Sequence, residues 1–146
     1  MKALLSRATI ASLLLGTSML ASAADLPRTP APEGAEVFIV SPKDGATVDK
    51  TFTVKFGIKK LDLEPIDKQV PNAGHHHLLV DRDVKSLDAN APIPADPTSI
   101  HFGKAQTETE LTLTPGEHTL QLVAGDNLHR QFEPTIASKV ITVNVK

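Results

Sequence analysis

Apolar and polar side chains alternate along most of the chain, and this period of two predicts β-strands. In the stretch 51–58 every second residue is apolar, from Phe52 to Ile58, and the residues between are mostly polar. Such alternation is typical of a strand with one buried face. By the same criterion strands are expected at 35–40, 51–58, 75–81, 106–114, 118–123 and 137–145, with a short apolar island at 100–103.

Turn-forming residues separate these stretches at short intervals, and no helical periodicity follows the first residues. We therefore expect an all-β protein, an immunoglobulin-like sandwich of about six to seven antiparallel strands. Two long Pro-containing connections, 59–73 and 83–98, interrupt the pattern, and loops of this length are often functional or mobile. The expected core between the two sheets contains Val54, Phe56, Leu78, Val80, Leu120 and Leu122.

The first residues have the order of a secretory signal peptide. Lys2 and Arg7 precede an apolar run at 10–20, and Ala21-Ser22-Ala23 supplies the small residues that a signal peptidase needs. We expect a signal at 1–23, a solvated Pro-rich tether at 24–34 and one domain at 35–146. The apolar run is too short for a good membrane span, so a periplasmic or secreted protein without a membrane span after signal removal is predicted.

Composition narrows the partners that the domain can have. The chain has no Cys, Trp or Tyr, and its two Met lie in the predicted signal. Disulfides and soft sulfur sites for Cu(I) are thereby excluded, and the scarcity of aromatic rings disfavours sugar or single-stranded nucleic acid as a ligand. The net charge of −2 also argues against nucleic acid and anionic lipid.

Three of the six histidines are consecutive, at the start of the strand 75–81. Alternation gives His76 the core-facing side of this strand and leaves His75 and His77 together on the other, about 7 Å apart. A His-x-His pair on one strand face can bind a single metal ion through its imidazole nitrogens.

Strand pairing is expected to bring further candidate ligands to this pair. In an immunoglobulin-like order the strands 75–81 and 118–124 pair antiparallel, which places Asp126 and His129 beside the start of the first. The strand after His101 starts at the same end, whereas His118 should lie about 20 Å away. The predicted site is His75, His77 and His129, with His101 or Asp126 as the fourth ligand, for Cu(II) or Zn(II). Its affinity should fall as the pH drops through about 6.5, the usual pKa of histidine.

The sequence also resembles a family of small exported bacterial proteins known as domain of unknown function 4399. The resemblance rests on Gly-His-His-His-Leu-Leu-Val-Asp at 74–81 and on the stretches 37–45, 53–57, 100–103, 106–108 and 115–122, followed by Gly125, Asp126 and His129. It covers nearly the whole chain after the signal. It implies export, but the family brings no established activity.

Two other functions compete with metal binding. In the first, the histidines form a hydrogen-bonded cap, and the domain is a structural or protein-interaction module of the cell envelope. The second, a hydrolase, has the weakest basis, because the chain lacks Cys and none of its serines has the context of a nucleophile elbow. We therefore expect that the protein is not an enzyme and that its partner is a divalent ion or an envelope protein.

Overall fold

The computed structural model describes residues 26–68 and 70–146, so the predicted signal peptide at 1–23 lies outside the described residues. Within the described part the regular elements are strands and two 3-10 turns, and no helix there is long and apolar enough to cross a membrane. The strands are β1 (Glu36–Ser41), β2 (Ala46–Val48), β3 (Thr51–Lys59), β4 (Asp62–Leu63), β5 (Ala73–Val80), β6 (Ser99–Phe102), β7 (Glu108–Thr112), β8 (Gly116–Gly125) and β9 (Ile141–Val145), and the 3-10 turns are η2 (Ile66–Lys68) and η3 (Val84–Ser86).

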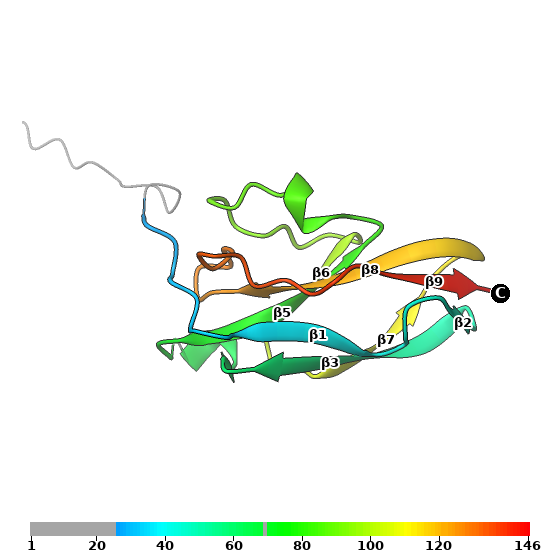
Figure 1. Cartoon of the computed structure of the whole chain (residues 1–146), viewed down its shortest axis with the longest axis horizontal. Helices are drawn as coiled ribbons and strands as arrows, with labels where there is room; N and C mark the ends of the chain where they lie inside the picture. Colours follow the sequence, from blue (N-terminus) through cyan, green and yellow to red (C-terminus); the bar gives the residue numbers. More distant parts are fainter. Residues whose placement is uncertain (1–25, 69) are drawn as a thin grey trace, which may run out of the picture.

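These strands form two sheets that face each other, which confirms the predicted all-β sandwich (Figure 1). The smaller sheet has the order β1-β3-β7, and the larger has the order β2-β9-β8-β5-β4 with β6 also paired to β5. The long ladders are antiparallel as expected. Two short ladders, β2 with β9 and β4 with β5, are parallel, a detail that strands of two or three residues do not reveal in the sequence.

The predicted core is confirmed, because all six of its residues belong to one buried apolar cluster. Alternation in β3 buries Val54 and Phe56 and exposes Thr53 and Lys55, as the period of two requires. On the facing sheet Leu120 of β8 is completely buried.

Strand β5 is buried along its whole length, on both of its faces. The inner face packs on the smaller sheet, and the connection that follows β5 covers the outer face. Ile93 of this connection forms a second apolar cluster with Leu79 of β5 and Val123 of β8. The long connection is therefore a cover for the central strands at Leu79 and Val123.

The N-terminal segment 26–34 differs from the solvated tether that its prolines predict. Its backbone pairs with the segment after β8, with hydrogen bonds from Ala31 N to Glu133 O and from Glu133 N to Thr29 O, both 2.8 Å long. The Arg28 guanidinium also donates to the carbonyl oxygens of Gln131 and Phe132. The described part of the segment thus lies on the domain surface beside residues 126–135.

Truncation of a core leucine tests the assignment of the inward face. Leu120→Ala should lower the free energy of unfolding by about 2–5 kcal/mol, because it removes buried methyl groups and leaves a cavity. Leu128→Ala is the matched control, since Leu128 is 43% exposed, and it should change stability by less than about 0.5 kcal/mol. Urea denaturation measures both, and equal losses would show that the inward face is misassigned.

Candidate metal centre

The pairing of β5 with its two neighbours gathers histidines on the outer face of the larger sheet. In the antiparallel ladder with β8, His75 lies opposite Gly125 and His77 opposite Val123. On the other side of β5, His101 of β6 lies directly opposite His77. The predicted pairing of the 75–81 and 118–124 strands is therefore confirmed. The sequence predicted only that His101 lies at the same end of the sandwich. In the structure it is the direct cross-strand neighbour of His77.

Four imidazole rings meet at this place, and we call them the histidine cluster: His75, His77, His101 and His129. The ring centroids of His75 and His77 are 4.9 Å apart, and their Nε2 atoms are 3.0 Å apart. The His101 ring lies 4.7 Å from that of His75 and 4.9 Å from that of His77. The His129 ring lies 5.0 Å from His75 and 4.8 Å from His101.

The cluster has a buried floor and a more open rim. His75 and His77 are 1% and 0% exposed, whereas His101 and His129 are only partly buried. One ring nitrogen from each of His75, His77 and His101 lies within 4.8 Å of the others, so these three can hold one metal ion. His129 stands against this triad at the rim, 6.3 Å from His77 between ring centroids.

Glycine at position 125 makes room for the buried nitrogens. A Cβ atom there would lie 3.0 Å from His77 Nε2 and 3.1 Å from His75 Nε2. Gly103 serves His101 in the same way, because a Cβ atom there would lie 2.5 Å from His101 Cε1. The sequence singles out Gly125 only through the family resemblance, and its position opposite His75 in the ladder with β8 is the signal that points to this role.

Hydrogen bonds account for few of the ring nitrogens. His75 and His77 share one bond between their Nε2 atoms. Among the described residues, His77 Nδ1 and His101 Nε2 are buried without a hydrogen-bond partner. Buried polar atoms are normally hydrogen-bonded. If the cluster were only a hydrogen-bonded cap, these two nitrogens would remain buried without a partner. The unpartnered nitrogens are not the two Nε2 atoms that share the hydrogen bond, and one nitrogen from each ring of the triad could hold a metal ion.

Burial keeps the floor of the cluster uncharged. It is the main cause that lowers the pKa of His75 to about 3 and that of His77 to about 2, with the neighbouring histidines as further causes. Burial and then His129 also lower the pKa of His101. Neutral imidazole is the form that binds metal. For His75 and His77 the competition between protons and metal therefore falls well below the pH of about 6.5 that the unperturbed side chain suggests.

Asp126, the other predicted ligand, is not brought into the cluster. Its Oδ1 accepts hydrogen bonds from the backbone N–H groups of Leu128 at 2.9 Å and Arg130 at 2.8 Å. Its Oδ2 accepts a bond of 2.7 Å from the Thr29 hydroxyl. The carboxylate is thus directed to the backbone of its own loop and to the N-terminal segment.

His76 faces the core, as the alternation in β5 predicts. Its ring packs on Phe56 with 5.3 Å between centroids, and neither of its nitrogens has a hydrogen-bond partner among the described residues. The backbone hydrogen bond that a capping role requires is therefore absent from the described part. Burial lowers its pKa to about 4.

His118 lies at the opposite end of β8, as expected, and it has partners of its own. Its Nδ1 is 2.7 Å from Asp81 Oδ2, and its Nε2 donates to Thr114 O at 2.8 Å. The hydrogen bond to Asp81 is the main cause that raises the pKa of His118. A histidine with two acceptors serves as a clamp between the end of β5 and the start of β8.

Comparison with known proteins gives a family and a structural likeness. A family model described as "Domain of unknown function (DUF4399)" matches residues 54–146. Among solved structures, the chain is similar to one described as "Structures of Clostridium thermocellum CbhA fibronectin(III)-like modules", with a TM-score of 0.38 and 17% identity over 75% of this chain and 92% of that chain. No curated protein matches the sequence.

The lowered pKa values predict how the stability of the metal-free protein depends on pH. The unfolded chain takes up protons at about pH 6.5, but burial lowers the pKa of folded His75 to about 3, that of His76 to about 4 and that of His77 to about 2. Below about pH 6.5 the unfolded state therefore binds more protons, and the free energy of unfolding should fall as the pH drops.

Thermal unfolding in the presence of a chelator, at pH values from about 7.5 to 5, measures this dependence above the range where most carboxylates titrate. His77→Gln should make the slope shallower. His118→Gln should make it steeper, because the raised pKa of His118 gives a contribution present below about pH 6.5 and lost as the pH rises through the folded value. A melting temperature of the parent that stays constant across this window would contradict the assignment.

Proposed function

The chain belongs to the domain of unknown function family DUF4399, and we propose that it is an exported, non-enzymatic protein that binds one divalent metal ion through the histidine cluster. His75 and His77 form the floor of the site, His101 completes the triad, and His129 is the fourth ligand. The ion is Cu(II) or Zn(II), and the β-sandwich serves as its rigid support.

One observation carries the proposal: four imidazole rings are gathered with centroids 4.7 to 6.3 Å apart, and only one hydrogen bond joins any two of them. The spacing also suits an ion. Zinc binds imidazole nitrogen at about 2.0–2.1 Å, so two neighbouring ligand nitrogens lie about 3 Å apart around one ion. His75 Nε2 and His77 Nε2 are 3.0 Å apart, and Gly125 leaves the space beside them free of a side chain.

The chemistry of the ligands supports the choice of ion. The chain has no Cys, and its metal ligands in this site would all be nitrogen atoms, which suit Cu(II) and Zn(II). By the general affinity order, Cu(II) should bind more tightly than Zn(II). The absence of a nucleophile elbow in the sequence supports a role in binding rather than in catalysis.

Metal titration of the tag-free chain without its signal tests the site. The parent should bind one Cu(II) or Zn(II) ion in isothermal titration calorimetry. His77→Ala should weaken binding by at least about tenfold, the lower end of the loss caused by removing groups that support a metal site. His76→Leu is the matched control, because it removes the central histidine of the same run from the opposite face of β5, and it should retain the affinity of the parent.

Two outcomes would count against the site. Equal losses from His77→Ala and His76→Leu would show that the run binds metal without the geometry of the cluster. A parent protein that ignores metal at micromolar concentration would remove the metal function altogether, and elemental analysis of protein purified from the periplasm provides an independent check.

Export has its own test. The order of basic, apolar and small residues that ends at Ala23 supports removal of a signal peptide. Mass spectrometry of the protein from a periplasmic fraction should show a chain that starts at Ala24 or Asp25. A full-length chain retained in the cytoplasm would be incompatible with this part of the proposal.

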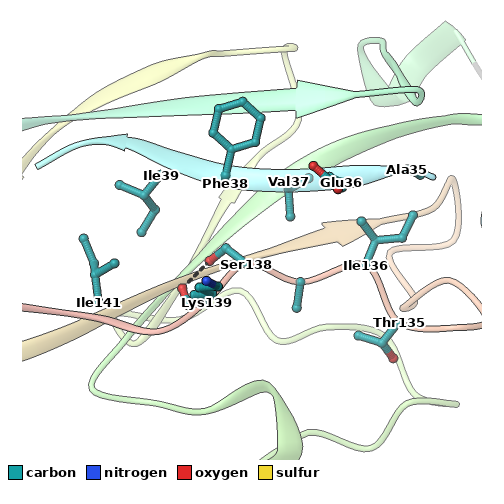
Figure 2. Close-up of a pocket in the computed structure, with 11 residues that line it drawn as sticks. Ala35, Glu36, Val37, Phe38, Ile39, Thr135, Ile136, Ser138, Lys139 and Ile141 are labelled. Atoms are coloured by element: carbon teal, nitrogen blue, oxygen red, sulfur yellow. Dashed lines mark hydrogen bonds between the residues drawn. The ribbon is translucent and has the colours of Figure 1, made fainter. Parts of the chain in front are cut away.

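A second candidate function is a protein-interaction module of the cell envelope, and a groove on the side of the sandwich favours it. The groove has a volume of ≈ 470 Å³ and lies between residues 35–39, at the start of β1, and the segment 135–141. Figure 2 shows Val37 and Ile39 on one side and Ile136 and Ile141 on the other. Because β1 pairs only with β3 among the strands of the described residues, its outer edge can accept an extended peptide as an added strand.

A further inference from the structure

We propose that Asp126 is a positioning residue, which holds His129 in place as the fourth ligand without touching the ion. The inference rests on the proposed function, since it concerns how that metal centre is built. It replaces the role of direct ligand that the sequence suggests for Asp126, and it makes the N-terminal segment part of the support of the centre.

Asp126 forms hydrogen bonds with the residues that precede and follow His129 in the sequence. Its Oδ1 binds the N–H groups of Leu128 and Arg130, the two residues next to His129. Its backbone O accepts from His129 N at 2.8 Å, and its N donates to Arg130 O at 2.8 Å. Asp126 is only 2% exposed, so little competition from water weakens these bonds.

The backbone of His129 needs such support. Its φ angle is 60°, in the left-handed region that side-chain-bearing residues adopt only at a cost. The surrounding bonds must therefore hold this conformation. One of them comes from the cover over β5, since Ile93 N donates to His129 O at 2.6 Å. The others are the backbone bond from His129 N to Asp126 O and the bonds that the Asp126 carboxylate accepts from Leu128 N and Arg130 N.

The N-terminal segment fixes the carboxylate in turn. The Thr29 hydroxyl donates to Asp126 Oδ2 at 2.7 Å. The Arg130 guanidinium donates to the carbonyl oxygens of Leu26 at 2.8 Å and Pro27 at 2.9 Å. Both carboxylate oxygens are thus used within the protein, and the loop 126–130 is tied to a segment that lies far away in the sequence.

The conservative substitution separates a positioning role from a ligand role. In Asp126→Asn the side-chain carbonyl oxygen can still accept from Leu128 N and Arg130 N, so the loop and His129 should stay in place. As a metal ligand, however, an amide oxygen is a poor substitute for a carboxylate. Positioning therefore predicts that Asp126→Asn binds metal like the parent, and ligation predicts a large loss.

The experiment is a Cu(II) titration of the exported chain in five forms: the parent, Asp126→Asn, Asp126→Ala, His129→Ala and the double variant Asp126→Ala/His129→Ala. Asp126→Ala should lose about 10–100-fold in affinity, the range found for groups that orient metal ligands. The double variant should bind no more weakly than His129→Ala, because both changes remove the same ligand. The electron paramagnetic resonance spectra of Cu(II) bound to Asp126→Ala and His129→Ala should coincide.

The proposal is overturned if Asp126→Asn binds as weakly as Asp126→Ala, if Asp126→Ala binds like the parent, or if the two losses add in the double variant. If Asp126→Ala shows no cooperative thermal transition, Asp126→Asn decides alone, by keeping or losing the affinity and spectrum of the parent. A parent that binds no Cu(II) refutes the proposed function instead. In that case the imidazole NMR signals of the metal-free protein still test the positioning role. Asp126→Asn should leave the His129 signals unchanged, and Thr29→Val should shift them. The signals of His118 serve as the reference that neither variant should change.

Discussion

The antiparallel ladder between β5 and β8 is the constraint on which the rest of the structure depends. Its register places Leu78 opposite Leu122 inside the sandwich. The same register places His75 opposite Gly125 on the outer face. Because side chains alternate strictly between faces, a slip by one residue would turn the core leucines outward and carry His76 into the cluster. The core and the histidine cluster therefore depend on the same strand register.

The same ladder explains how uncharged histidines come to lie close together. Four imidazolium ions at these distances would repel one another, and burial would penalise each charge further. His75 and His77 are 1% and 0% exposed, and this burial is the main cause that keeps them neutral. At the far end of β8, His118 meets Asp81 instead and is stabilised in its charged form. The two ends of this strand pair thus shift the pKa of their histidines in opposite directions, downward for His75 and His77 and upward for His118.

Much of this arrangement follows from local patterns in the sequence. Alternation in 51–58 and 75–81 is sufficient to predict the core faces and to separate His76 from its neighbours, because that period is a property of the single strand. The β5–β8 pairing follows from the order of strands in sandwiches of this class. His118 could be placed away from the cluster by strand length alone.

What the sequence did not reveal depends on contacts between distant segments. The short strand β6 contains too few residues to show that it pairs with β5, although this pairing is what brings His101 opposite His77. Asp126 looks like a ligand because a carboxylate close to a histidine is a common metal-binding pattern. Its actual partners, above all Thr29, come from a Pro-rich stretch whose composition suggests a free linker. Only the folded chain shows that this stretch lies on the domain.

The chain enters the domain beside the histidine cluster and leaves it at the other end of the sandwich. Leu26 is bound by Arg130, next to His129, whereas Val145 pairs with Gly116, at the start of β8 (Figure 1). A β-strand of ten residues, such as β8, separates its two ends by about 30 Å. A fusion partner, a fluorophore or a surface linker joined after Lys146 is therefore attached about a strand's length from the cluster, whereas the same addition ahead of Leu26 is attached beside the loop that carries His129.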